Sequence, residues 1–234
     1  MPDRSSSART AIRGVTLGVD VVLFTPRGNE LAVLLTPLVG GRGRGKERWS
    51  LPTDSLSADE SLGDAAARVA RDVLGAAPSF LDQAGAHGGA RKPSDAAAPQ
   101  ISVTYFGLVP VAGGNARRGA EWLGMSELPV LSVRERDQLD ATVAAMRARV
   151  DQQPIAFRLL PPAFTLSDLQ AVYELLLGRR LHKASFRRSL HASALVEATD
   201  EWRSEGRGRP AQLFRYAPPR RRRQRRGIRF DLLA

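Results

Sequence analysis

The stretch FTLSDLQAVYELLLGRRLHKASFRRSL, residues 164–190, has the pattern of two short helices joined by a tight turn. Thr165 is a favoured N-cap residue, and Asp168 three positions later completes a capping-box pattern. Gly178 is placed to end this first helix, because glycine adopts the left-handed conformation of a helix C-terminus without strain. A second, basic helix is expected over residues 183–190. The order predicts a helix-turn-helix in which the first helix supports the second.

The second helix of this pair has the pattern of a DNA-reading helix. Phe186 and Leu190 are four residues apart, so they share one face and are expected to face the core. The polar residues then lie on the open faces, where they can reach phosphates and base edges in a major groove. The candidate DNA-binding residues of this helix are Lys183, Ser185, Arg187 and Arg188.

Two extended segments, residues 194–197 and 212–216, flank a basic, glycine-rich loop at 206–210. Two helices followed by a two-stranded ribbon with a cationic tip are the order of a winged helix-turn-helix, which we place at residues 154–217. The alternative is a solvated helical hairpin with an ordinary basic surface. The candidate DNA contacts of the wing are Arg207 and Arg209.

The charge of the chain is unevenly distributed. Its 234 residues carry 35 Lys and Arg against 24 Asp and Glu, which gives a formal net charge of +11. Residues 1–153 have a net charge of +1, and residues 154–234 have +10. A GC-rich genome, the alternative source of arginine, would not leave the first part balanced. The distribution therefore predicts a polyanion such as nucleic acid as the partner of the second part, and the winged-helix pattern specifies double-stranded DNA.

Composition excludes several classes of protein. The chain contains no Cys, which excludes disulfide frameworks, thiolate zinc sites and cysteine nucleophiles. Residues 1–14 lack the apolar core of a signal peptide and are expected to be disordered. No stretch has the roughly 18 apolar residues of a membrane span. We expect a soluble, cytoplasmic protein that ends in a basic tail at 218–234, whose Arg run adds at most non-specific attraction.

Residues 15–134 predict a separate domain made of strands around one helix. Strands at 15–24 and 31–35 are expected to form a hairpin, and the spacing of apolar residues predicts a helix from Glu60 to Leu74. Another strand is expected at 100–111. Strands, one helix and more strands favour an α+β sandwich over an alternating α/β sheet.

The segments that join these elements are less regular. Residues 84–99 are of low complexity and are expected to form a mobile loop. A connecting helix is predicted at 135–153, since apolar residues recur there on one face. Residues 157–160 are expected to form a short strand before the helix-turn-helix.

Residues 54–75 resemble a degraded Nudix hydrolase box. The first Glu and the Arg of that pattern are present as Glu60 and Arg68. Of the three positions at which the pattern has metal-binding carboxylates, Asp72 alone is acidic, and the other two are Val69 and Val73. One carboxylate between two valines does not form an oxygen-rich magnesium site.

The resemblance implies a Nudix-like α/β/α sandwich, and the two valines predict that it is catalytically inactive and holds no metal or cofactor. The alternative is a magnesium-dependent Nudix hydrolase of ADP-ribose or a related dinucleotide.

The chain from about residue 15 to 216 resembles the family of Nudix-related transcriptional regulators of NAD metabolism, the NrtR-like family. The likeness is strongest in the second half and is carried by short motifs. These are FRLLP (157–161), FTLSDLQ (164–170), VYE (172–174), LG (177–178), FRR (186–188) and GRPA (208–211), with LDQ (81–83) and SVTYF (102–106) in the first half.

The resemblance implies a Nudix-like domain that senses a metabolite, often ADP-ribose, and a winged helix that represses NAD-related genes as a homodimer on a palindromic operator. This sequence departs from the family pattern after Gln83, and in the recognition helix, where Ala184 and Ser185 replace the usual Arg-Asn pair. The second departure is expected to alter the operator that is read or the affinity for it. The candidate effector-binding residues are Arg48, Trp49 and Glu60. A competing hypothesis is a module that binds RNA or an acidic protein by charge alone.

Overall fold

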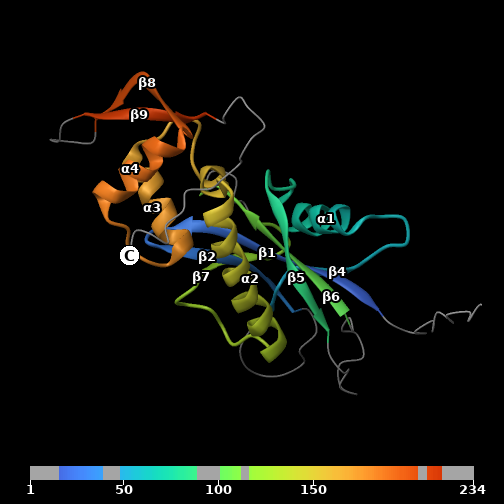
Figure 1. Cartoon of the computed structure of the whole chain (residues 1–234). Helices are drawn as coiled ribbons and strands as arrows, with labels where there is room; N and C mark the ends of the chain where they lie inside the picture. The colour runs from blue at the N-terminus through green and yellow to red at the C-terminus, as the bar shows by residue number, and fades with distance from the viewer. Residues whose placement is uncertain (1–15, 39–47, 89–100, 112–115, 205–209, 218–234) are drawn as a thin grey trace, which may run out of the picture.

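The computed structural model describes residues 16–38, 48–88, 101–111, 116–204 and 210–217 (Figure 1). The expected disordered and basic tails, most of the glycine-rich loop of the wing and the end of the low-complexity segment lie outside these ranges.

A mixed sheet forms the centre of the first part of the chain. Its seven strands follow the order β3-β2-β1-β6-β5, with β4 paired to β1 and β7 paired to β2. The pairing of β1 with β6 is parallel, and the others are antiparallel. The strands are β1 (Leu17–Arg27), β2 (Glu30–Pro37), β3 (Trp49–Ser50), β4 (Thr53–Ser55), β5 (Leu81–Gly88), β6 (Ile101–Leu108) and β7 (Glu121–Gly124).

The predicted hairpin is confirmed as β1 and β2, and both strands are longer than expected. Thr25 and Pro26 continue β1 rather than beginning the turn, and they pair with β2. Gly28 has a φ of 59°, the left-handed conformation that a tight turn requires and that glycine adopts without strain.

The expected mobile loop at 84–99 is wrong for its first five residues. Ala84 to Gly88 belong to β5, and Gly85 to Gly88 pair with β6, with a register shift at Ala84 between Gln83 and Gly85. Small residues give little strand propensity, but backbone hydrogen bonds to a neighbouring strand do not depend on the side chain. Tertiary pairing therefore decides the conformation of this segment.

Helices α1 (Leu62–Leu74) and α2 (Val133–Gln152) cover opposite faces of the sheet (Figure 1). Side chains alternate along β1 as the pleat requires: Val19, Val21 and Leu23 pack in the cluster that contains α1. Val22 and Phe24 pack in the cluster that contains α2. The result is the α/β/α sandwich that the sequence predicted.

Helix α2 is more than a connection. It starts at a capping box formed by Ser132 and Glu135, and it packs on β5 and β6 as well as on α3. Its buried residues include Gln138, Leu139, Met146 and Val150. The predicted linker helix is thus also the second outer layer of the sandwich.

The second part of the chain has the predicted winged-helix order. A 3-10 helix, η2 (Ile155–Leu159), precedes α3 (Leu166–Leu177) and α4 (Lys183–Ser193), and β8 (Val196–Arg203) pairs with β9 (Ala211–Tyr216). The short strand expected at 157–160 is wrong. Alternating apolar residues in so short a run fit a strand or a tight helical turn, and here Ile155, Phe157 and Leu159 are buried without a strand partner in the described sheets.

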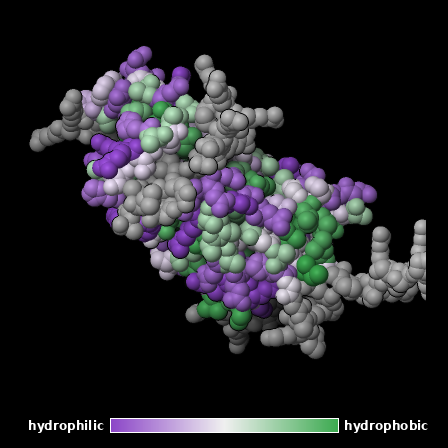
Figure 2. Space-filling view, in the orientation of Figure 1, coloured by the Kyte–Doolittle hydropathy of each residue, from purple (hydrophilic) through white to green (hydrophobic). Residues whose placement is uncertain are grey.

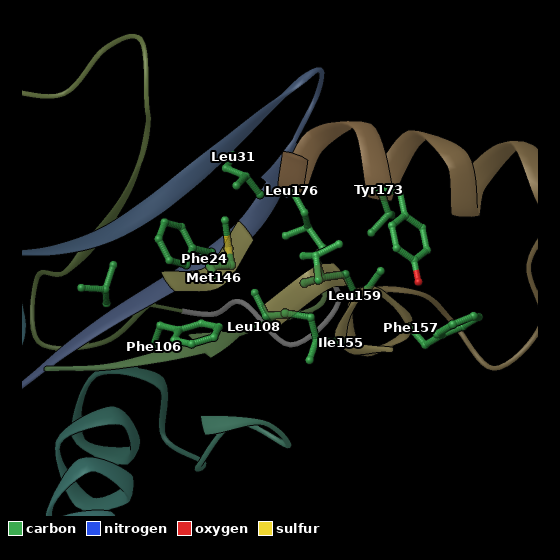
Figure 3. Packing of buried hydrophobic residues seen from close by; sticks show 14 of the residues in the cluster. Phe24, Leu31, Phe106, Leu108, Met146, Ile155, Phe157, Leu159, Tyr173 and Leu176 are labelled. Carbon is green, nitrogen blue, oxygen red and sulfur yellow. The ribbon is translucent and has the colours of Figure 1, made fainter. Parts of the chain in front are cut away.

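One apolar cluster extends from the sheet into the winged helix (Figure 3). Phe24 and Leu31 of the sheet, Met146 of α2, Ile155 of η2 and Leu176 of α3 belong to the same buried cluster. Figure 3 shows Leu31 and Leu176 close together where β2 meets α3. The winged helix is therefore packed directly on the sandwich.

Candidate nucleic-acid interface and sensing surface

The turn between α3 and α4 is held by two side chains of α3. The Glu174 carboxylate accepts hydrogen bonds from the Leu181 amide (2.9 Å), from Gln170 (2.9 Å) and from Arg180 (3.2 Å). The Gln170 amide nitrogen also donates to the Leu181 carbonyl at 3.0 Å. Burial would raise the pKa of Glu174, but the hydrogen bonds from Leu181, Gln170 and Arg180 outweigh it and lower that pKa. The start of α4 is thereby fixed against α3.

The rotation of α4 is fixed by two buried residues. Phe186 and Leu190 are fully buried, as predicted, and the Phe186 ring packs edge-on against Tyr173 of α3 with ring centroids 5.7 Å apart. Hydrophilic side chains gather over the outer side of α4 (Figure 2). The predicted contacts Lys183, Arg187 and Arg188 are all exposed.

Ser185 differs from the other predicted contacts on α4. It is half-buried, and its hydroxyl lies 3.3 Å from Nδ1 of His182 at the helix start. The structure leaves Lys183, Arg187 and Arg188 exposed along α4, and Ser185 less so. The wing residues Arg207 and Arg209 lie outside the described residues.

The wing is fastened to the start of α3. Asp168 accepts from the Thr165 amide at 2.8 Å through one carboxylate oxygen and from Arg203 of β8 at 2.9 Å through the other. Burial would raise the pKa of Asp168, but the bonds from Arg203 and Thr165 lower it. Phe164 and Phe214 exchange backbone hydrogen bonds at 3.0 and 2.8 Å. The predicted capping residue thus also positions the wing.

The predicted effector residues lie in different surroundings. Arg48 is exposed, whereas the Trp49 side chain is 9% exposed and packs in the apolar cluster on the α2 side of the sheet. Glu60 accepts two hydrogen bonds from Arg68, at 2.7 and 3.1 Å, and one from the Ser57 amide at 2.8 Å. Arg68 and the Ser57 amide lower the pKa of Glu60 to about 2. Glu60 is therefore ionised at neutral pH, and both of its carboxylate oxygens accept hydrogen bonds.

The remains of the Nudix box do not assemble an acidic cluster. Val69 and Val73 are 4% and 5% exposed and pack in the apolar cluster between α1 and the sheet. Asp72 forms an ion pair with Arg118 at 3.4 Å. Among the residues that the structure describes, no group of three or more His, Asp or Glu side chains is arranged to hold a metal ion.

A buried polar network joins the sheet to α2. Asp20 of β1 accepts from Ser102 at 2.5 Å and from the Gln138 amide of α2, and Arg134 donates to the Ser102 hydroxyl at 2.8 Å. One turn earlier, Glu135 accepts from the Ser50 hydroxyl at 2.5 Å. The N-terminal half of α2 is thus hydrogen-bonded to the sensing part of the chain.

Sequence reasoning missed these positioning residues, although some signals were present. Gln170 and Glu174 are polar residues four apart in the largely apolar stretch 169–177 of α3, and Asp20 interrupts a β-branched run. Both are typical of buried polar groups with specific partners. Gln138 carried no comparable signal, because its partner lies 118 residues away in the sequence.

Comparisons with known proteins agree with this arrangement. Residues 156–216 match the family described as the NrtR DNA-binding winged helix domain. The ADPR-responsive transcriptional repressor NtrR of Acinetobacter baylyi is 30% identical over 207 residues, which cover 85% of this chain and 81% of that protein.

Solved structures give the same likeness. The crystal structure of Shewanella oneidensis NrtR complexed with a 27mer DNA has a TM-score of 0.72 at 26% identity, over 86% of this chain and 93% of that chain. A MutT/nudix family protein from Enterococcus faecalis shares the fold, with a TM-score of 0.63 at 16% identity over 93% of this chain and 89% of that chain. In the described part of the chain, no helix combines the length and apolarity of a membrane span.

Proposed function

Since this chain belongs to the NrtR family of Nudix-related transcriptional regulators, we propose that it binds a palindromic operator as a homodimer and represses genes of NAD metabolism. Its Nudix-like part is a sensor for a nucleotide metabolite, with ADP-ribose the first candidate because the Acinetobacter baylyi relative is ADPR-responsive. A regulator of this kind works in the cytoplasm, on the nucleoid.

The observation that carries this proposal is the open face of α4. Phe186 and Leu190 hold one side of the helix against α3, so Arg187 and Arg188 are presented to solvent in the way a recognition helix presents its side chains to a major groove. Two such helices related by a two-fold axis would read the half-sites of a palindrome.

The sensor is proposed to be catalytically inactive. Hydrolysis of a diphosphate by a Nudix-like site needs several carboxylates that share a divalent cation. Val69 and Val73 supply apolar surface in place of two of them, and the guanidinium of Arg118 neutralises the third position, Asp72. Asp72, the one carboxylate among these three positions, is therefore paired with the Arg118 side chain.

Helix α2 is the proposed route from sensor to winged helix. Ser50 follows the candidate effector residues Arg48 and Trp49 in the sequence. Its hydroxyl donates a hydrogen bond to Glu135 at the start of α2. At the other end of the helix, Met146 packs in the cluster that continues into the winged helix. A ligand that favours one position of the segment around Trp49 would shift the population of α2 positions, and with it the spacing of the two recognition helices.

The test of DNA binding is the double variant Arg187→Ala/Arg188→Ala. We expect operator binding to be lost while the thermal unfolding midpoint stays within a few degrees. Arg27→Ala/Arg136→Ala removes two positive charges from the sensor part and should leave binding nearly unchanged. Unaltered DNA affinity in the first variant would contradict the proposal.

The test of sensing without catalysis uses ADP-ribose. We expect ADP-ribose to release the protein from its operator, and to remain intact after long incubation with the protein and Mg²⁺. Turnover that requires Mg²⁺ and disappears in Asp72→Ala would instead establish the hydrolase alternative.

A further inference from the structure

The packing of α4 determines which of its side chains face away from the protein. Phe186 and Leu190 mark the side that lies against α3. Since successive residues of an α-helix are separated by about 100°, Arg188 points opposite to the middle of that side. On the outer face, Ala184 and Ala192 lie about 40° to either side of Arg188, and His191 lies about 20° beyond Ala184.

Ala184, Arg188 and His191 therefore form one stripe along the helix, at spacings i, i+4 and i+7, which we call the reading stripe. All three residues are exposed. Arg187 and Lys183 are also exposed, but they lie on the flank of the helix between the reading stripe and the buried side.

Several described arginines of the winged helix differ in whether they are paired within the protein. Arg180, Arg203 and Arg215 are each paired with an acidic side chain of the same domain, at 2.9 to 3.2 Å. Within the described part of the chain, neither Arg187 nor Arg188 forms such an ion pair. Their guanidinium groups are therefore available to an external acceptor.

We propose that the two adjacent arginines have different roles, an inference that rests on the proposed function. Arg188, at the centre of the reading stripe, makes the bidentate contact that reads a guanine through its O6 and N7 atoms in the major groove. Ala184, one turn earlier, lies against the methyl group of a neighbouring thymine, and the imidazole of His191 extends the stripe by one turn. Arg187 and Lys183, on the flank, contact backbone phosphates and carry no base preference.

Arg187→Ala and Arg188→Ala form a matched pair, since each removes one exposed guanidinium from the same helix. Each variant and the parent protein are used to select duplexes from a randomised library. The affinity for the most enriched duplex is then measured by titration at several salt concentrations. For Arg188→Ala, we expect one base position in each half-site to become degenerate, with discrimination there reduced about tenfold or more.

For Arg187→Ala, we expect the same selected motif, a uniformly lower affinity across sequences and a log–log salt slope smaller by about 1. His191→Ala should weaken selection only at the end of the half-site read by the last turn of α4. Equal unfolding midpoints for the variants and the parent protein would exclude a folding defect.

The reverse assignment would overturn this inference: base preference lost in Arg187→Ala and retained in Arg188→Ala. Equal losses of affinity with an unchanged motif in both variants would also overturn it, while leaving the proposed function in place. A parent protein that enriches no motif from the library would overturn the inference and the operator-binding function together.

Discussion

The carboxylate of Glu174 on α3 accepts a hydrogen bond from the backbone amide of Leu181 at 2.9 Å, across the turn that leads to α4. The amide precedes the recognition helix by two residues, so this bond sets where that helix begins. The Glu174 side chain is 13% exposed, so little water can reach the Leu181 amide to accept its hydrogen bond in place of the carboxylate.

Glu174→Ala should therefore destabilise the protein by about 1 to 3 kcal/mol, because the Leu181 amide loses its partner in a poorly hydrated site. Urea unfolding at neutral pH measures this change. Glu174→Gln keeps an acceptor oxygen, so its free energy of unfolding should fall by less. Since the pKa of Glu174 is lowered in the folded state, its stabilising contribution is present at neutral pH and is lost as the pH falls below the ordinary glutamate range. Equal losses in both variants would contradict the role of the acceptor.

Asp168 connects the capping box of α3 to the wing through its ion pair with Arg203. Asp168→Ala removes both interactions, and we expect a loss of about 1 to 2 kcal/mol from the cap. Faster hydrogen exchange is expected at the Phe214 amide, which bonds to Phe164 beside the cap. Arg203→Gln keeps the cap, so it should speed hydrogen exchange in the wing without the loss of stability that comes from the cap. Unchanged exchange at Phe214 in both variants would show that the wing is held by other contacts.

The winged-helix elements could be predicted closely from the sequence because their signals are local. Thr165, Asp168 and Gly178 occupy the cap positions in the structure that the sequence assigned to them. The burial of Phe186 and Leu190 follows from helical spacing within a single element. Side chains that act within four residues of one another leave a pattern that periodicity can detect.

The rest of the candidate site depends on contacts between distant parts of the chain. The sequence allows Trp49 either to stack on a ligand or to lie in the core. The pairing of β3 with β2 decides between the two, since the Trp49 side chain lies in the cluster that also contains residues of α2. Asp72 acquires its partner, Arg118, from a turn 46 residues further along the chain. Neither relationship has a period or a spacing that a single sequence displays.

Packing of the winged helix on the sandwich predicts a single unfolding transition. Leu176 of α3 and Leu31 of β2 belong to one buried cluster (Figure 3), so neither part retains its full core without the other. Leu176→Ala should lower the free energy of unfolding by about 2 to 5 kcal/mol and keep one transition in calorimetry. Leu166→Ala changes a partly buried leucine of the same helix, so it should lower the free energy of unfolding by less. Two separate transitions in the parent protein would show that the parts fold independently.

The pairing of Glu60 with Arg68 predicts a specific acid sensitivity. The pKa of Glu60 is lowered from 4.5 to about 2, chiefly by the hydrogen bonds of Arg68. A carboxyl group whose pKa is lower in the folded than in the unfolded protein stabilises the fold fully above the unfolded value. That contribution is then lost as the pH falls from about 4.5 towards 2.

Glu60→Gln should therefore unfold more readily than the parent protein at pH 6, and the difference between the two should shrink steadily from pH 4.5 to pH 2.5. Thermal unfolding followed across this range measures it. Asp140→Asn, which alters an exposed carboxylate paired with Arg136 on α2, is the matched control, and its smaller effect should come from a surface pair. A difference between Glu60→Gln and the parent protein that stays constant with pH would mean that the fold does not lower the pKa of the Glu60 carboxyl group.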